Sequence, residues 1–320
     1  MKFEAPLKLG LSQELINFWQ KMFPGSQDVT IEALLGDELD YNRGVFYIAR
    51  KGNKLAGTCH VTVPLNIPYL GGFGEVATEL EFRREGIATE LSRQALEEFK
   101  ALGGQAMFLG TSEPGPARMY RRLGWHRLAG SNVMANITTG ASPEEYMVDY
   151  FRRTGKFTVQ AGGPPHRVPM IPLILTPHNV QVLDSNVPLY STPYNLQRSC
   201  MGLYPRYNAV TKNGFGAWFA AVTEDHRIVG LSSVRTDKPN SCRVDGFTHY
   251  RFAEAWKPLI DAALAWGKEN GATTGYAVLS VEDEQKHQMY QSEGFARWEP
   301  GEDLEFDNRK VESIKMGKTI

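Results

Sequence analysis

The sequence predicts an α/β protein in which one kind of domain occurs twice in tandem. Stretches rich in β-branched and aromatic residues alternate with amphipathic stretches of helical spacing, in the same order in both halves of the chain. A Tyr-x-x-x-Gly-aromatic element occurs at Tyr120 and again at Tyr290, 170 residues later. A proline-rich stretch, 162–177, separates the two halves. Repetition on this scale indicates a duplicated domain, each copy with its own core.

The 320 residues are enough for two domains of ordinary size. We expect the first domain to span residues 1–155 and the second to span residues 178–320. The residues between them, 156–177, predict an extended linker or crossover, because proline fixes φ and removes a backbone donor. The alternative is a proline-rich surface loop within one domain.

The predicted elements follow the same order in each half. In the first half we expect strands at 44–50, 55–63, 73–80 and 106–110, and helices at 87–102 and 116–123. In the second half we expect strands at 216–222, 228–234, 244–248, 276–281 and 312–320, and helices at 252–270 and 283–292. The turn 51–54 joins the first two strands as a hairpin, and Gly103 and Gly271 end the long helices.

The composition excludes several classes of protein. Hydrophobic residues make up 42% and charged residues 22% of the chain, which is typical of a globular protein. The net charge of −1, without a block of like charge, argues against a nucleic-acid surface. The sequence has no apolar run long enough for a membrane span and no signal-peptide core, so a cytoplasmic protein is expected. The cysteines and histidines lack metal-ligand spacing, so no metal site is expected.

A glycine-containing loop is the strongest candidate for a functional site. The run 83–88, Arg-Arg-Glu-Gly-Ile-Ala, lies between a predicted strand and a predicted helix. The N-terminus of a helix has unpaired amides and a partial positive charge, and it therefore favours anions. Gly86 and Ala88 let the backbone approach such an anion, while Arg83 and Arg84 add positive charge. A helix start with solvated arginines is the alternative interpretation.

This loop resembles the R/Q-x-x-G-x-G/A signature of the GNAT N-acetyltransferases, with Arg83, Gly86 and Ala88 at the signature positions. The downstream element Tyr120-x-x-x-Gly124-Trp125 is similar to the Y-x-x-x-G-F element of the same family. The resemblance covers most of the first half and, more faintly, the second. It implies two GNAT-like domains, each with a mixed, largely antiparallel central sheet flanked by helices, and acetyl-CoA as the co-substrate.

The resemblance also implies roles for particular residues. It places the acetyl-pantetheine arm along the backbone of Val76, Ala77 and Thr78. It places the pyrophosphate on the amides of Arg84, Glu85, Gly86, Ile87, Ala88 and Thr89, with Arg83 beside them. It places Tyr120 near the thioester sulfur. One departure is Glu113, which stands where many family members have an asparagine, and this removes the expectation of a coenzyme contact there.

Acetyl transfer to an amine needs a proton acceptor and an acid for the leaving thiolate. Tyr120 is predicted to be the acid; the alternative is a packed tyrosine whose hydroxyl reaches a backbone carbonyl. Glu75 is the first choice of base, because it precedes the backbone that would contact the thioester. Glu79 and Glu81 share its face of an ideal strand, and water alone is a further alternative.

The second copy lacks the glycine loop. Its corresponding run, 251–256, contains Glu254, which would repel a pyrophosphate, and Trp256, which would crowd it. Because Tyr290 and Gly294 remain, we expect an intact fold with a structural or substrate-binding role.

The loop 83–88, Tyr120 and the family resemblance together predict an N-acetyltransferase. It would move an acetyl group from acetyl-CoA to an amine of a small molecule. The alternatives are an acetyl-CoA-binding sensor without catalysis and a protein or peptide N-acetyltransferase. Four aromatic residues are candidates for an acceptor pocket or for the core: Trp19, Tyr204, Tyr207 and Trp218. The acceptor and the oligomeric state do not follow from the sequence.

Overall fold

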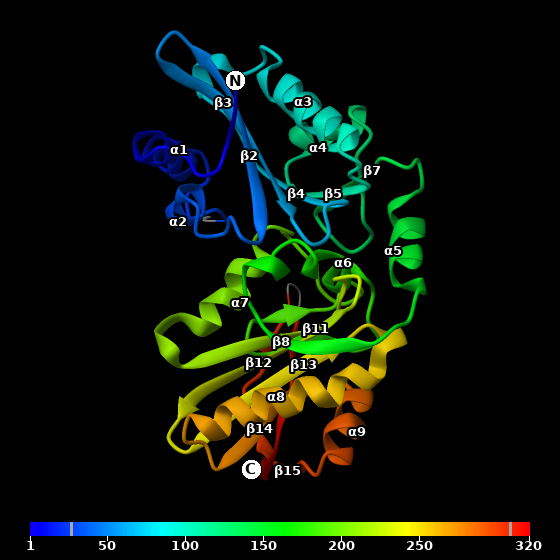
Figure 1. The fold of residues 1–320 in the computed structure, drawn as a ribbon. Coiled ribbons are helices and arrows are strands. Elements are labelled where there is room, and N and C mark those ends of the chain that lie inside the picture. The colour runs from blue at the N-terminus through cyan, green and yellow to red at the C-terminus, as the bar shows by residue number, and fades with distance from the viewer. Residues whose placement is uncertain (26–27, 307–308) are drawn as a thin grey trace.

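The computed structural model describes residues 1–25, 28–306 and 309–320. Within these residues the chain forms two seven-stranded sheets, one from each half, and Figure 1 shows them as two layered domains. Helices flank each sheet, and both sheets are mixed but mostly antiparallel. The predicted fold class, two tandem domains of one α/β kind, is therefore confirmed.

The first sheet has the strand order β1-β2-β3-β4-β5-β7-β6. Its strands are β1 (Lys2–Glu4), β2 (Asn42–Lys51), β3 (Lys54–Pro64), β4 (Leu70–Thr78), β5 (Ala106–Gly110), β6 (His126–Arg127) and β7 (Val133–Ile137). Neighbouring strands are antiparallel except β4 and β5, which run parallel. The parallel pair is joined through a helix, as parallel strands require.

The second sheet repeats this arrangement in the order β15-β18-β14-β13-β12-β11-β8. Its strands are β8 (Phe157–Ala161), β11 (Gly216–Thr223), β12 (Ile228–Lys238), β13 (Ser241–Thr248), β14 (Thr274–Ser280), β15 (Ala296–Pro300) and β18 (Ser313–Thr319). Its parallel pair is β13 and β14. Two small hairpins complete the strands: β9 (Val182–Asp184) with β10 (Leu189–Tyr190), and β16 (Leu304–Glu305) with β17 (Lys310–Val311).

The helices also correspond between the two copies. The crossover helices are α3 (Ile87–Ala101) and α8 (Trp256–Glu269), followed by α4 (Pro114–Arg122) and α9 (Glu284–Ser292). The remaining helices are α1 (Leu9–Met22), α2 (Ile31–Leu35), α5 (Pro143–Arg152), α6 (Met170–Leu175) and α7 (Leu203–Thr211), with 3₁₀ turns η1 (Leu80–Phe82), η2 (Pro164–His166), η3 (Lys212–Gly214) and η4 (Tyr250–Ala255).

Period-two alternation assigns the two faces of the first sheet. Val45 and Tyr47 on β2 join the apolar cluster beneath α3 and α4. Their neighbours Phe46 and Ile48 join the cluster beneath α1 and α2. Successive side chains of a strand point to opposite faces, so helices cover the sheet on both sides. Figure 1 shows α1 and α2 on one side of β2 and α3 and α4 on the other.

The structure differs from the prediction in the proline-rich region. The expected linker, 156–177, contains strand β8, the turn η2 and the helix α6. Strand β8 pairs with β11 as an edge of the second sheet, in the place that β1 has in the first sheet. Pro164 and Pro165 lie in the first turn of η2, where the missing N–H costs nothing. We therefore propose that the second domain begins near Phe157.

Other differences are local. The strand expected at 73–80 ends at Thr78, and η1 follows. The helix expected at 252–270 is the turn η4 followed by α8, because Phe252 has a non-helical backbone. The helices α1, α2, α5 and α7 were not predicted.

The two domains share one hydrophobic core. A single cluster of buried residues includes Leu70 and Phe108 of the first sheet and Trp218 and Leu231 of the second. Helix α6 lies within this cluster: all six of its residues are buried, and the five other than Pro172 are at most 3% exposed. A helix that is apolar on all sides must be enclosed on all sides. The contact between the domains is therefore packed like a domain interior.

We expect Ile171→Ala in α6 to lower the free energy of unfolding by about 2–5 kcal/mol, because Ile171 is fully buried and a cavity would remain. Urea unfolding followed by tryptophan fluorescence and by circular dichroism measures this change. Because the core is shared, both probes should shift together in one transition. Val148→Ala, at a position that is 64% exposed, should change stability by less than about 0.5 kcal/mol. Two separate transitions, with only one of them shifted, would contradict a shared core.

Candidate active site

The parallel strands β4 and β5 separate after three paired residues. Leu70 to Gly72 pair with Ala106 to Phe108, but β4 continues to Thr78. A cavity of about 340 Å³ occupies the opening. Its lining comes from β4, β5, α4 and two more distant segments: Phe23, Asp28, Phe73, Gly74, Glu75, Val76, Leu109, Gly110, Thr111, Ser112, Glu113, Pro116, Tyr120, Arg198, Ser199 and Met201.

A β-bulge at Glu75 shapes this cavity. The register of β4 on β3 shifts between the pairs Gly74–His60 and Ala77–Thr58. Glu75 has φ +49°, which is unusual for a residue with a side chain. Such strain costs on the order of 1–3 kcal/mol and persists only where the surroundings impose it. The bulge breaks the alternation of an ideal strand and leaves both Glu75 and Val76 on the cavity lining.

Polar contacts hold the bulge in place. The hydroxyl of Thr58 donates a hydrogen bond to the carbonyl oxygen of Glu75 at 2.7 Å. The indole N–H of Trp19 donates to the same hydroxyl at 3.0 Å. The Glu75 side chain is 9% exposed, and its Oε2 lies 3.8 Å from Nδ1 of His60. Within the described part of the chain, neither of these two buried atoms has a hydrogen-bond partner. The carboxylate can therefore accept a proton from a molecule in the cavity.

The two alternative carboxylates lie elsewhere. Glu79 forms an ion pair with Lys21, and Glu81 forms one with Lys54. Neither lines the cavity. The structure thus brings only Glu75, of the three glutamates considered as bases, to the opening between β4 and β5.

The predicted anion-binding loop has the expected backbone. Arg84 and Gly86 have φ +68° and +81°, and Gly86 is the N-cap of α3. The first helical hydrogen bond runs from the Glu90 amide to the Gly86 carbonyl at 2.9 Å, so the amides of the preceding first turn lack an intrahelical partner. A Cβ built on Gly86 would meet no described atom within 4 Å, so the loop leaves room for an anion. The side chain of Arg83 donates to the Thr78 carbonyl at 3.3 Å.

Tyr120 on α4 lines the cavity and packs its ring against Phe73 and Trp125. Burial raises the pKa of its hydroxyl well above the ordinary value, so the group stays protonated at neutral pH. None of the described residues forms a hydrogen bond with its hydroxyl, and its ring is held by the two aromatic contacts. In the second copy, the Tyr290 hydroxyl donates instead to the Val244 carbonyl at 3.2 Å. The packed alternative considered for Tyr120 thus describes Tyr290.

The other predicted residues divide between the site and the core. Val76 lines the cavity, whereas Ala77 turns to the core under α1 and Thr78 pairs with Gly57 of β3. The four aromatic candidates for the acceptor pocket, Trp19, Tyr204, Tyr207 and Trp218, are all buried in the core. Sequence reasoning missed Phe23, Asp28 and residues 198–201, because no local pattern shows that these distant segments meet β4.

The second copy occupies part of the corresponding opening with its own side chains, and a cavity of about 370 Å³ remains beside them. Strand β13 pairs with β12 without interruption from Gly230–Thr248 to Arg235–Arg243, so the stretch that corresponds to the bulge is regular. The Trp256 ring packs edge-on against Tyr290, and its N–H donates to the Gly246 carbonyl at 3.3 Å. At the offset of 170 residues that relates the strand ends Thr78 and Thr248, Trp256 corresponds to Gly86.

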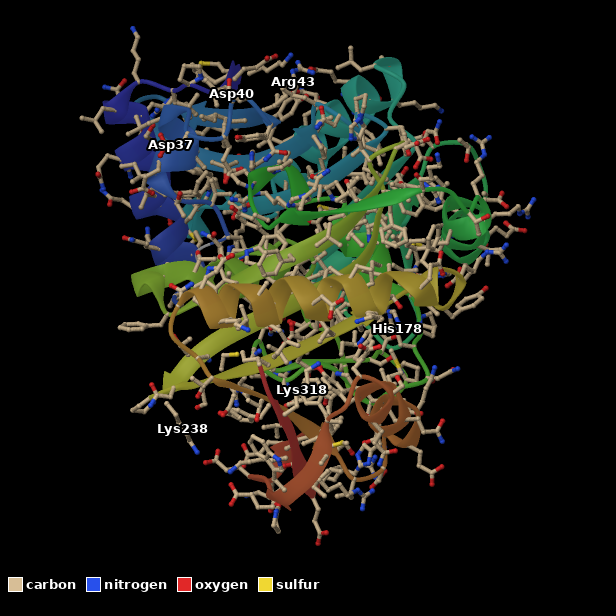
Figure 2. All side chains as sticks on the ribbon, turned by 60° about the horizontal axis from the view of Figure 1, so that its bottom comes forward. Asp37, Asp40, Arg43, His178, Lys238 and Lys318 are labelled. Carbon is tan, nitrogen blue, oxygen red and sulfur yellow. The ribbon has the colours of Figure 1, made fainter. Side chains whose placement is uncertain are left out.

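The segment that contains β9 fills the rest of this opening. Lys286 on α9 is almost fully buried and pairs with Asp245 of β13 at 2.5 Å. Its ammonium also donates to the carbonyls of Val182 and Leu183 at 2.8 and 3.0 Å. The amide of Ser185 donates to Asp245 at 2.8 Å. His178, labelled in Figure 2, begins this segment and contacts the Phe247 ring edge-on. The β9 segment thus fills the part of the opening around Asp245, and His178 lies on the lining of the cavity that remains.

Comparisons with known proteins agree with this geometry. Residues 6–128 match the family model described as an acetyltransferase (GNAT) domain. Similar solved structures include a GNAT-family acetyltransferase from Streptococcus pneumoniae, with 12% identity, a TM-score of 0.38, and coverage of 52% of this chain and 100% of that chain. Another is a phosphinothricin acetyltransferase from Sinorhizobium meliloti in complex with AcCoA, with 13% identity, a TM-score of 0.33, and coverage of 39% and 71%. A comparison with curated proteins found no match.

The family match and the repeated sheet identify the class of the protein. Residues 6–128 match a GNAT acetyltransferase domain, and the two repeated sheets fit a tandem arrangement of two such folds. This match supports the assignment of the protein to the acyltransferases, which transfer an acyl group from a donor to an acceptor. In the described part of the chain, no group of His, Cys, Asp and Glu side chains is arranged to hold a metal ion. None of the described helices has the length and apolar character needed to cross a membrane.

We expect Lys286→Met to lower the free energy of unfolding by about 3–5 kcal/mol, because it would leave the Asp245 carboxylate buried without its partner. Lys257→Met removes an exposed ion pair on α8 and should cost less than about 1 kcal/mol. Chemical unfolding of both variants measures the difference. Equal, small effects would show that the packing of the β9 segment does not depend on the buried pair.

Proposed function

We propose that the N-terminal domain transfers an acetyl group from acetyl-CoA to an amine of a small molecule. The observation that carries this proposal is the cavity in which the bulged Glu75 and the Tyr120 hydroxyl both face the opening between β4 and β5. The family match of residues 6–128 supports the class of the reaction. The remaining steps follow from the chemistry of these side chains.

The residues of the loop fit the pyrophosphate of coenzyme A. The run 84–89 contains two residues with a left-handed backbone, Arg84 and Gly86. Its amides lie at the positive, N-terminal end of the 15-residue helix α3. Arg83 and Arg84 add positive charge, and Gly86 leaves the approach open. When bound, acetyl-CoA supplies a thioester whose carbonyl carbon is open to attack by an amine. The backbone of Val76 to Thr78 follows the bulge and is positioned to receive the acyl arm.

Two side chains manage the protons. The carboxylate of Glu75 accepts a proton from the attacking amine, directly or through a water molecule. Its Oε2 lies 3.8 Å from Nδ1 of His60 and accepts no hydrogen bond from the described residues, so the proton does not have to displace one. The Tyr120 hydroxyl donates a proton to the departing thiolate. The hydroxyl is protonated at neutral pH, and because burial raises its pKa, the donation depends on the negative charge that develops on the sulfur.

The second copy lacks the glycine loop and has a supporting role. Trp256 occupies the place of the loop glycine, and the segment around β9 narrows the opening, which keeps a cavity of about 370 Å³. Because only the first copy has the anion-binding loop, one acetyl-CoA per chain is expected. The cavity of the first domain is bounded on one side by Arg198, Ser199 and Met201, and its volume of about 340 Å³ favours a small acceptor over the side chain of a folded protein.

We expect Gly86→Glu to weaken acetyl-CoA binding more than tenfold, or about 1.4 kcal/mol. Position 86 has φ +81°, and the new carboxylate would lie at the helix N-terminus where the pyrophosphate binds. Titration calorimetry measures the affinity and the stoichiometry, which should be near one. Ala253→Glu, in the turn η4 just before α8 of the second copy, is the control and should bind as the wild type does. Equal losses at both positions would contradict a single site.

We expect Tyr120→Phe to lower kcat and kcat/KM alike by on the order of 10²–10⁴, with the smaller loss favoured because a thiolate leaves readily. Acetyl-CoA affinity should hardly change, because the ring packing remains. Release of free thiol with a panel of amines measures the rate. Tyr290→Phe is the control in the second copy and should retain the wild-type rate. Wild-type binding of acetyl-CoA with no thiol release from any amine would favour a sensor over an enzyme.

A further inference from the structure

A segment from the second half of the chain forms one wall of the cavity in the first domain. We call residues 197–201 the wall segment. Three of its members, Arg198, Ser199 and Met201, line the cavity together with residues of β4 and β5. A fourth, Cys200, is fully buried beside them. The cavity is therefore composite, although its predicted catalytic residues all belong to the first domain.

Backbone hydrogen bonds fix the wall segment to the first domain. The Asn132 amide donates to the Gln197 carbonyl at 2.8 Å, and the Gln197 amide donates to the Gly130 carbonyl at 3.2 Å. Ser131 and Gln197 form a parallel bridge. At the other end, the Gly202 amide donates to the Ser199 hydroxyl at 3.1 Å. The bonds of Gln197 hold one end of the wall segment to the first domain, and the bond between Gly202 and Ser199 forms a local turn at the other end.

Close packing brings the wall segment against the two parallel strands. A Cβ on Gly110 of β5 would lie 3.2 Å from the Cα of Ser199. A Cβ on Gly72 of β4 would lie 2.3 Å from the sulfur of Met201. Any side chain at Gly72 would thus displace Met201. The glycines permit an approach that larger residues would prevent.

The wall segment lies on the acceptor side of the cavity. Tyr120 belongs to the core under α3 and α4, on the face of the sheet that carries the loop for coenzyme A. Phe23 packs with the core under α1, on the opposite face. Both line the same cavity, so it passes between β4 and β5 from one face to the other. Because coenzyme A would lie on the side of Tyr120, the wall segment and Phe23 are the residues that can contact the acceptor.

The charged groups of the lining are mostly acidic. Asp28, Glu75 and Glu113 carry carboxylates, and Arg198 is the only basic residue among the described lining residues. Burial raises the pKa of the Cys200 thiol. The Asp28 and Glu75 carboxylates raise this pKa further, because both carboxylates lie near the wall segment. Phe23, Phe73 and Met201 supply apolar surface. Such a lining attracts a cation with an apolar body and repels a carboxylate.

We propose that the wall segment forms the acceptor site and selects an amine that arrives as its cation on a compact apolar body, disfavouring the corresponding amino acid. The ammonium releases one proton to solvent before the neutral amine attacks the thioester, and Glu75 accepts the second. This proposal rests on the proposed acetyl transfer. Ser199 sets the depth of the site, and Arg198 limits its preference for cations. The second half of the chain thereby determines specificity for chemistry that takes place in the first.

The first experiment compares Ser199→Phe with Leu196→Phe in the full chain. Phenylalanine at 199 would occupy the cavity, whereas Leu196 is 42% exposed in the same stretch and does not line it. With phenethylamine as acceptor, Ser199→Phe should raise KM at least tenfold while the acetyl-CoA dissociation constant stays within twofold of the wild type. Leu196→Phe should change neither. An unchanged KM in a Ser199→Phe protein with a normal thermal melt would overturn the proposal.

The second experiment tests charge at an exposed position, where folding is not at risk. The wild type should favour phenethylamine over phenylalanine in kcat/KM. Arg198→Gln should lower the KM for phenethylamine by about two- to fivefold, because it removes the one positive charge of the lining. Arg152→Gln, on an exposed side chain of α5, is the control and should have no effect. A preference for phenylalanine, or a raised KM for phenethylamine in Arg198→Gln, would overturn the proposal.

A failure of the proposed function has a different outcome. If no amine releases thiol from acetyl-CoA, acetyl transfer is refuted, and calorimetry then decides the acceptor site. Binding of phenethylamine to the wild type that is lost in Ser199→Phe and kept in Leu196→Phe would support it. No binding to the wild type would overturn it.

Discussion

The structure depends on how briefly its parallel strands pair. In each sheet the two parallel neighbours share three residues of register, β4 with β5 and β13 with β14. Beyond those residues the facing edges diverge, and their backbone groups must find other partners. The role proposed for each copy depends on what occupies that opening. In the first copy it is a cavity lined by the bulge and Tyr120, and in the second the β9 segment and Trp256 occupy part of it beside a cavity of about 370 Å³.

The two fillings show how a duplicated domain acquires a different role. In the second copy, Tyr290 and Trp256 donate to carbonyls of β13, and Lys286 ties the β9 segment to Asp245. These contacts satisfy the open edge permanently. In the first copy the counterpart tyrosine faces the cavity, and the bulge at Glu75 redirects the strand. The common core around α6 then holds the second copy against the first.

Local patterns predicted what local physics determines. Alternation and helical spacing located most strands of both sheets and the two crossover helices, and the loop before the first of these helices was placed from its glycine and its context. Proline density misled, because prolines begin short helices as readily as they extend a linker. The wall segment was beyond prediction, since its contacts with Gly110 and Gly72 join residues about 90 to 130 positions apart in the chain. The same holds for the β9 segment around Lys286.

The bulge at Glu75 has a consequence for the history of the chain. It adds one residue to β4 relative to the regular β13, so the strands of the two copies differ in length between equivalent landmarks as well as in side chains. Amino-acid replacement alone leaves a strand's length unchanged. Returning the second copy to an open site would therefore require an inserted codon in β13, in addition to removal of Trp256 and release of β9. Divergence by insertion or deletion is difficult to reverse, and it commits the second copy to supporting the first.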